Sequence, residues 1–443
     1  MSLGGGTWES QNKKLPGVYI NFVSSTAPDD FNSERGIVAF PTSMDWGPEA
    51  EIITMTKAEF EEKPYNFLLT KSSDAKNMVF REMFRNAHTI LLYRANTGTK
   101  ATCTYCDAKY SGIRGNDLKI VISTNVDDET KFDVKTYLKT DSIDELLDLQ
   151  TVAIATALKN NDFVEWKTGW ELAATTGVML TGGTGGANDV LTTEQYLAGL
   201  DAFAAYHFNA LCAPVRGESL AKAIIERTKY MRDSLGIKFQ TVMYRQETAD
   251  YEGIVSVQNA VNTSGGIPDL GLVFWVSGAV AACPINVSNS NKIYDGELTV
   301  VCTETQSQLV DALDNGKFIL HKVGQTIRVL EDINTLTTFT ETKNEDFSRN
   351  QTIRIIDQIA TDFANIFNTK YNGKIPNNES GRLSLWNDLV SHHRELERIG
   401  AIENFTADDI TVEPGDDKTS VVVNDAVQLI SAMEKLYVTV VIS

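Results

Sequence analysis

The sequence is poor in cysteine, histidine and positive charge, and each shortage excludes a class of protein. Five cysteines and five histidines among 443 residues are too few for a disulfide framework or a histidine-rich metal centre. Lysine and arginine number 40 against 59 aspartates and glutamates, which gives a net charge of −19. Because a phosphate backbone would be repelled by this field, we expect no general nucleic-acid binding.

Long hydrophobic runs are also scarce. The longest, residues 270–283 (LGLVFWVSGAVAAC), is shorter than the roughly 18–20 residues that a membrane-spanning helix needs. Pro268 and Pro284 bracket it, and we predict a buried strand that passes into a short helix, with no membrane insertion. No basic leader followed by an apolar segment opens the chain, so we expect free thiols in a reducing cytoplasm.

What remains is an ordinary globular composition, 42% hydrophobic and 22% charged, long enough for two to four domains. The first thirty residues are rich in Gly, Ser and Asp around one apolar island, residues 18–23. Such a segment cannot bury the island against itself and predicts an N-terminal arm. A β-α-β pattern follows: a strand at 37–40, a helix at 74–86 and a strand at 90–94.

Residues 97–180 interrupt this pattern with short strand-like runs, among them 118–123 and 131–138, separated by turn residues. We interpret them as an inserted, mainly β domain. Its exit, residues 181–188 (TGGTGGAN), has the composition of a flexible linker.

Residues 191–334 alternate between helical and strand patterns, which predicts a mostly parallel sheet covered by helices. Thr192 and Gln195 have the spacing of a capping box, and so do Thr303 and Gln306. We predict strands at 208–215, 237–244, 271–276 and 317–323, and helices at 196–206, 219–235, 251–260 and 309–313.

The last hundred residues contain two helical patterns, 346–374 and 383–399, and strand-like runs at 419–423 and 436–442. Apolar residues occupy most of the first helix, so only a narrow face is expected to meet water. The terminal run has no later partner in the chain. Such an exposed edge favours association with other copies of the protein.

No motif of known chemistry is complete. The histidines (His88, His207, His321, His392 and His393) lie in no protease motif, and no Gly-x-Ser-x-Gly elbow occurs. His392 and His393 are expected to point about 100° apart on a helix, too divergent to share a metal. We therefore expect no catalytic residue and structural histidines.

Cys103 and Cys106 have CxxC spacing, but a strand would direct them to opposite sides and spoil chelation. The glycine-rich run 181–186 lacks the Gly-Lys-Ser/Thr ending of a phosphate loop. The acidic stretch 403–417 does not have the order of an EF-hand; we expect a solvated loop there, or alternatively a charged contact with a neighbouring molecule. No metal and no cofactor is predicted.

Several segments resemble one family, the contractile-tail sheath proteins of phages and phage-like particles of Gram-positive bacteria. They are residues 4–22 (GGGTWESQNKKLPGVYINF), residues 328–344 and 346–374, and the pair Trp275-Val-Ser-Gly278 and Tyr294-Asp-Gly296. The resemblance implies a subtilisin-like α/β domain with the β insertion, an α+β C-terminal domain, and extended N- and C-terminal arms. We divide the chain into residues 1–30 (N-terminal arm), 31–96 (β-α-β part of the core), 97–182 (inserted sandwich-like β domain), 187–334 (subtilisin-like domain) and 335–443 (C-terminal sheath domain with the terminal strand).

The same resemblance implies a structural subunit, not an enzyme, that polymerises around a tail tube and contracts to drive the tube through the host envelope. Expected partners are further copies in stacked hexameric rings, the tube protein, and baseplate and terminator proteins, in a virion tail made in the bacterial host cytoplasm. The alternative is a surface module whose β domain binds a glycan or a receptor. We predict these contacts between subunits: Val18, Tyr19, Ile20, Phe22, Leu436, Tyr437, Val438, Thr439, Val440, Val441 and Ile442.

Overall fold

A computed structural model describes residues 35–141, 143–262 and 268–442. Its centre is a seven-stranded sheet in the order β14-β13-β12-β11-β1-β3-β2. All neighbouring strands run parallel except β2 and β3. The strands are β1 (Ile37–Thr42), β2 (Ile52–Thr56), β3 (Thr89–Arg94), β11 (Ala210–Ala213), β12 (Gln240–Tyr244), β13 (Ile254–Val257) and β14 (Lys317–Phe318).

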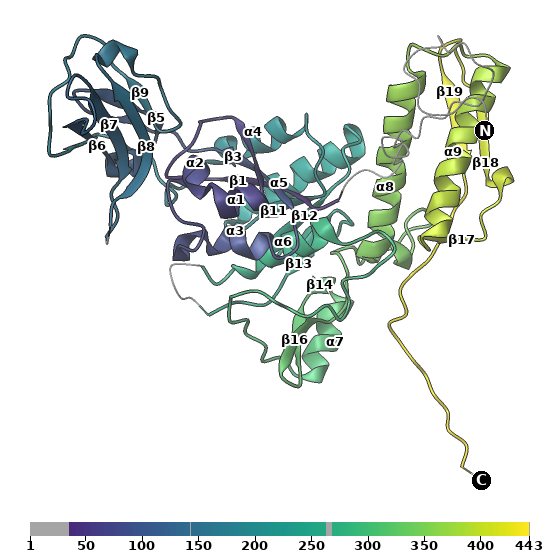
Figure 1. Cartoon of the computed structure of the whole chain (residues 1–443). Helices are drawn as coiled ribbons and strands as arrows, with labels where there is room; N and C mark the ends of the chain where they lie inside the picture. The colour runs from purple at the N-terminus through teal and green to yellow at the C-terminus, as the bar shows by residue number, and fades with distance from the viewer. Residues whose placement is uncertain (1–34, 142, 263–267, 443) are drawn as a thin grey trace, which may run out of the picture.

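Helices cover both faces of this sheet (Figure 1). Alternate strand residues point to opposite faces. Accordingly Val38 and Phe40 of β1 belong to one apolar cluster, while Ala39 belongs to another. The first cluster includes α1 (Lys57–Glu62), α2 (Pro64–Leu68), α3 (Met78–Met83) and α6 (Leu272–Ala282), and the second includes α4 (Thr193–Phe203) and α5 (Glu218–Lys229).

The capping box at Thr192 is confirmed: its hydroxyl accepts a hydrogen bond from the Gln195 N–H at the start of α4. The second box lies two residues later than predicted, at Thr305 and Gln308, before α7 (Gln306–Asp314). The strand predicted at 317–323 is β14 followed by β15 (Leu320–Val323), which pairs with β16 (Thr326–Val329).

Two predicted elements of the central domain are wrong. The apolar run predicted to begin as a strand is the helix α6, whose residues Leu272–Ala281 are all buried between α3 and the sheet. The segment 251–260, predicted as a helix, contains the buried strand β13. Periodicity cannot separate strand from helix where every side chain is buried, because no solvent-facing stripe remains.

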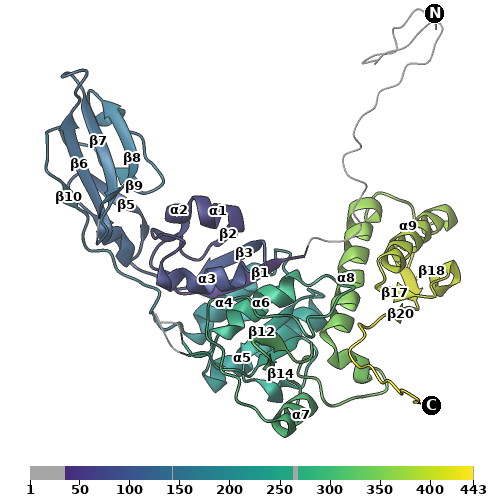
Figure 2. The same cartoon turned by 60° about the horizontal axis from the view of Figure 1, so that its bottom comes forward.

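The inserted domain projects from the body, on the side away from α8 (Asn350–Ile366) and α9 (Glu379–Arg398) (Figures 1 and 2). One sheet has the order β4-β5-β9 and the other β10-β6-β7-β8. Trp46 and Leu69 from the core segment pack among its buried residues. Its strands are β4 (Lys100–Thr102), β5 (Cys106–Ser111), β6 (Leu118–Thr124), β7 (Phe132–Leu138), β8 (Glu145–Val152), β9 (Val164–Trp166) and β10 (Val178–Met179).

The connection out of the β domain is not the free linker that its glycines suggest. Thr99 donates its backbone N–H to the Thr184 hydroxyl at 3.0 Å, and the Thr184 N–H donates back to the Thr99 carbonyl at 3.2 Å. A methyl group on Gly98 would overlap the carbonyl oxygen of Thr184. The glycines therefore allow the two connections to pack backbone against backbone.

In the C-terminal part, α8 and α9 pack beside two small antiparallel sheets. One pairs β17 (Ile402–Glu403) with β20 (Gln428–Leu429), and the other pairs β18 (Ile410–Pro414) with β19 (Val421–Asp425). β18 lies inside the acidic stretch that we expected to be a loop; the expectation is wrong for this part, because Ile410 is buried and its strand is paired.

Gly98→Ala should destabilise the protein by about 1–3 kcal/mol, because the added methyl group forces apart the two connections of the β domain, which pack backbone against backbone at Gly98 and Thr184. Thermal melting of the full chain measures this loss. Asn188→Ala, an exposed change in the same connection, is the control and should stay within about 0.5 kcal/mol. Equal melting temperatures of the two variants would contradict tight packing between these two connections.

Candidate functional site

The candidate functional site is the place where the last segment of the chain leaves the body. We call residues 431–442 the C-terminal arm; every residue in it is exposed. Figure 1 shows the end of the arm running away from the C-terminal sheets. The side chains of Leu436, Tyr437 and Ile442 are 87%, 89% and 91% exposed. So much apolar surface in one segment indicates an interaction site.

The root of the arm, in contrast, is fixed by named contacts. The side-chain amide of Gln351, at the start of α8, donates to the Ile430 main-chain carbonyl at 3.3 Å, and its side-chain oxygen accepts from the Ala432 N–H at 3.0 Å. Glu434 accepts hydrogen bonds from the hydroxyls of Ser288 and Ser290, at 3.3 and 2.5 Å, and pairs with Arg349. Beyond Glu434, no hydrogen bond holds the described part of the arm to the body.

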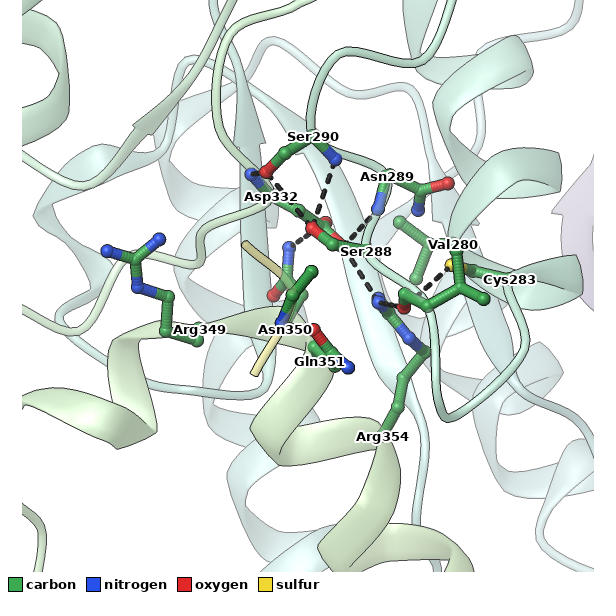
Figure 3. A network of polar contacts seen from close by, with 12 residues as sticks. Val280, Cys283, Ser288, Asn289, Ser290, Asp332, Arg349, Asn350, Gln351 and Arg354 are labelled. Atoms are coloured by element: carbon green, nitrogen blue, oxygen red, sulfur yellow. Dashed lines mark hydrogen bonds and ion pairs between the residues drawn. The ribbon is translucent and has the colours of Figure 1, made fainter. Parts of the chain in front are cut away.

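Beneath the root lies a buried polar network centred on Asp332 (Figure 3). Its carboxylate accepts from the Asn289 N–H at 2.9 Å, from the Asn350 side-chain amide at 2.9 Å and from the Arg354 guanidinium at 2.8 Å. The side chains of Asp332 and Arg354 are 1% and 2% exposed. The network joins the loop after α6, the loop before α8 and α8 itself.

Burial alone would lower the pKa of the Arg354 guanidinium, but the adjacent Asp332 carboxylate reverses the effect and holds that pKa above its ordinary value. Arg354 thus remains a cation inside the protein. A second buried pair, Arg232 with Asp357, has two contacts at 2.7 and 2.9 Å and ties α8 to the segment after α5. The two ion pairs fix the first half of α8 against the central domain.

The predicted contact residues fall into two groups. Val18, Tyr19, Ile20 and Phe22 lie outside the described residues. Residues 436–442 are extended and exposed but form no ladder within the described chain, so the expectation of a strand is not met by the subunit alone. Their contact with other subunits stays a prediction.

His392 and His393, which we expected to be structural, are adjacent residues of α9. The Nδ1 atoms of His392 and His393 lie 3.2 Å apart, and both side chains are fully buried. The Nε2 atom of His392 lies 3.0 Å from an Asp362 oxygen, and that of His393 lies 3.1 Å from an Asp425 oxygen. The histidines connect α8, α9 and β19. No group of three or more metal-ligating side chains occurs within the described residues.

Sequence reasoning missed Asp332, Arg354 and Glu434 altogether. A signal was present, because Arg354 and Asp357 are charged residues within a helix that was predicted to expose only a narrow face to water.

Among the helices that the structure describes, none has the length and apolarity to cross a membrane.

An exposed apolar arm beside an anchored root indicates a surface for interaction with another molecule. Comparison with known families identifies the class of protein. Residues 96–188 match the phage tail sheath protein beta-sandwich domain, residues 189–335 the phage tail sheath protein central domain, and residues 342–443 the phage tail sheath C-terminal domain.

The chain is 30% identical to the phage-like element PBSX protein XkdK of Bacillus subtilis, over 99% of each chain. It is similar to the solved sheath tail protein of Desulfitobacterium hafniense, with 34% identity, a TM-score of 0.77 and coverage of 95% of this chain and 99% of the other. For the sheath tail protein of Listeria innocua the identity is 32%, the TM-score 0.81 and the coverage 92% and 94%.

The helical sheath of the anti-feeding prophage in its contracted state shares the fold at 11% identity, with a TM-score of 0.55. The chain belongs to the phage tail sheath protein family. It is a contractile tail sheath subunit of a phage or phage-like injection system, a structural protein and not an enzyme.

Asp332→Ala should destabilise the protein by about 3–5 kcal/mol, because it leaves the Arg354 cation buried without its partner. The midpoint of thermal melting measures the loss. The neighbouring change Glu331→Ala removes a partly exposed partner of Arg349, 3.4 Å away, and should cost at most about 1 kcal/mol. A smaller effect for Asp332→Ala than for Glu331→Ala would show that the network does not hold the subunit together.

Proposed function

We propose that this subunit polymerises with copies of itself in stacked hexameric rings around a tail tube, and that the C-terminal arm is the tether between neighbours. The observation that carries the proposal is the contrast within one segment: the arm is anchored up to Glu434, whereas residues 435–442 are exposed and form no hydrogen bond with the described part of the body. An anchored root fixes where the arm starts, and the exposed part is then available to a second subunit.

Pairing with a sheet edge suits the arm chemically. Residues Leu436, Val438, Val440 and Ile442 would share one face of a strand, and Tyr437, Thr439 and Val441 the other. Each backbone hydrogen bond gained adds about 0.5–1.5 kcal/mol, and burial of apolar surface adds about 25 cal/mol per Å². Addition of a strand to an exposed edge is an established mode of recognition.

The ribbon of β18 and β19 is the receiving edge that we propose. It has two strands in the described chain, so each strand keeps one open edge. A groove of about 370 Å³ lies next to it, lined in part by Phe367, Ile375 and Val421. The arm of a neighbouring copy would find backbone partners on the ribbon and an apolar surface beside it.

Contraction requires subunits that repack while they stay joined. A backbone ladder between an arm and a neighbour's ribbon tolerates movement of the domains, since the arm bends between its root and its paired part. Energy stored in the extended lattice would then drive the tube through the host envelope. Baseplate and terminator proteins would bound the sheath at its ends, in a virion tail assembled in the host cytoplasm.

Two finer assignments belong to the same proposal. The first is that the central sheet is of the subtilisin-like type. The features that support this assignment are the mostly parallel strands, the interior position of β1 and the helices on both faces. The functional units are residues 1–30, 31–96, 97–182, 187–334 and 335–443, with residues Val18, Tyr19, Ile20 and Phe22 as contacts of the first unit.

Deletion of residues 436–443 should leave a monomer with near-native melting that forms no cylinders, because residues 436–442 are exposed and form no hydrogen bond with the described part of their own subunit. Thermal melting and electron microscopy of the truncated chain test this together. Normal cylinders would refute the tether, and a grossly lowered melting temperature would place the segment in the subunit's own core.

A matched pair of substitutions separates backbone pairing from apolar burial. Proline at Val440 and, separately, at Val441 removes a backbone donor from one of two adjacent positions, only one of which faces the receiving strand. One proline variant should assemble much less than the other, while Val440→Thr keeps the donor and should still assemble. Equal assembly of all three would exclude a strand ladder.

A further inference from the structure

The cysteine pair of the β domain contradicts its prediction from the sequence. Thr102 on β4 pairs with Asp107 on β5, so Cys103 and Cys106 face each other across the two-residue turn Thr104 and Tyr105. The Cys103 N–H donates to the Cys106 carbonyl at 2.9 Å, and the two Sγ atoms lie 3.7 Å apart. The expected divergence holds within one strand, whereas here a turn separates the residues.

This geometry is close to that of a disulfide. Residues in a hydrogen-bonded antiparallel pair have Cα atoms about 5.5 Å apart, within the roughly 4.4–6.8 Å that a disulfide spans. The backbone therefore needs no rearrangement, and side-chain rotation brings the sulfurs together. The other cysteines, Cys212, Cys283 and Cys302, form no such pair.

The two thiols differ in access. Cys103 is partly exposed, whereas Cys106 is fully buried. The ammonium of Lys167 lies next to the turn, 2.8 Å from the Cys103 carbonyl, and also contacts Asp107 at 3.0 Å. The Cys103 sulfur is therefore accessible to a small solute, whereas the buried Cys106 sulfur can react only with Cys103.

The reactivity of the thiols follows the same order. The Cys106 thiol hydrogen bond and nearby backbone N–H groups stabilise the Cys103 thiolate and lower the pKa of Cys103 to about 6, with a smaller contribution from Lys167. The pKa of Cys106 is raised by the Cys103 sulfur and by burial. A partly exposed thiolate is the nucleophile in thiol–disulfide exchange.

We propose that Cys103 and Cys106 form a thiol–disulfide exchange site on the β domain, whose co-substrate is a small soluble disulfide such as oxidised glutathione. Cys103 is the attacking thiolate and Cys106 the resolving thiol. This site is separate from the arm and its root, so the inference does not depend on the tether.

The reaction balances in two steps. The Cys103 thiolate attacks one sulfur of the small disulfide, forms a mixed disulfide and releases one small thiolate. Cys106 then attacks the Cys103 sulfur and transfers its proton to the departing small thiolate, so that the second small thiol is released. Two protein thiols are oxidised to one disulfide, and the small disulfide is reduced to two thiols.

The consequence of oxidation is local. The bond would close a loop with only two residues between the cysteines, so it restricts the unfolded chain little. It would instead fix the turn that carries Tyr105, whose ring lies 4.8 Å from that of Trp170. The main-chain carbonyl of Tyr105 also accepts from the Lys167 N–H at 2.9 Å.

The test uses the reduced full-length protein and oxidised glutathione, followed by peptide mass spectrometry without reductant. The wild type should lose two hydrogen atoms in the peptide that contains both cysteines. Cys106→Ser should accumulate a mixed glutathione disulfide on Cys103, and Cys103→Ser should accumulate far less on Cys106. A wild type that stops at the mixed disulfide, or equal trapping by the two variants, would overturn the proposal.

The order of reactivity has its own readout. Alkylation of Cys103 in the reduced protein should be half-maximal near pH 6 and, at pH 7, at least about tenfold faster than that of the partly exposed Cys302, whose pKa burial raises to about 11. Melting of each serine variant shows whether the hairpin is intact. Equal alkylation of Cys103 and Cys302 in the wild type would contradict the assignment without any variant.

Discussion

The carboxylate of Asp332 is the point at which three segments of the chain become one rigid unit. A buried carboxylate is tolerated only when it is paired and hydrogen-bonded, and here the Asn289 N–H, the Asn350 amide and the Arg354 guanidinium satisfy it together. Because the Asn289 donor lies in the loop after α6, whereas the Asn350 and Arg354 donors both lie on α8, this one carboxylate links three segments of the chain and fixes the position of α8. The root of the arm, at Gln351 and Glu434, follows from α8.

The joint between the central domain and α8 therefore combines directional polar contacts with apolar packing of Ile355 on Ile285. Removing one partner of a buried ion pair is strongly destabilising, because the other charge is left buried without compensation. The pairs of Arg354 with Asp332 and of Arg232 with Asp357 favour a single arrangement of α8 on the sheet.

Sequence reasoning succeeded where one physical rule dominated. Thr192 and Gln195 form the predicted cap because a capping box depends on four consecutive residues. It failed where distant contacts decide: α6 is buried on all sides, so its pattern has no period, and β13 lies in the sheet interior. The partners of Arg354, Cys103 and His392 come from turns and packing, which spacing along the chain does not encode.

The arm also gives the proposed assembly a direction. An arm that pairs with a ribbon joins two different surfaces, so the contact is head-to-tail and not self-complementary. Each added subunit then uses one free arm or ribbon at the end of the stack and presents a new one of the same kind. The two ends of a growing stack would differ in kind, one with unused arms and the other with unfilled ribbons, and a protein that stops growth at one end could not substitute for a protein that starts it at the other.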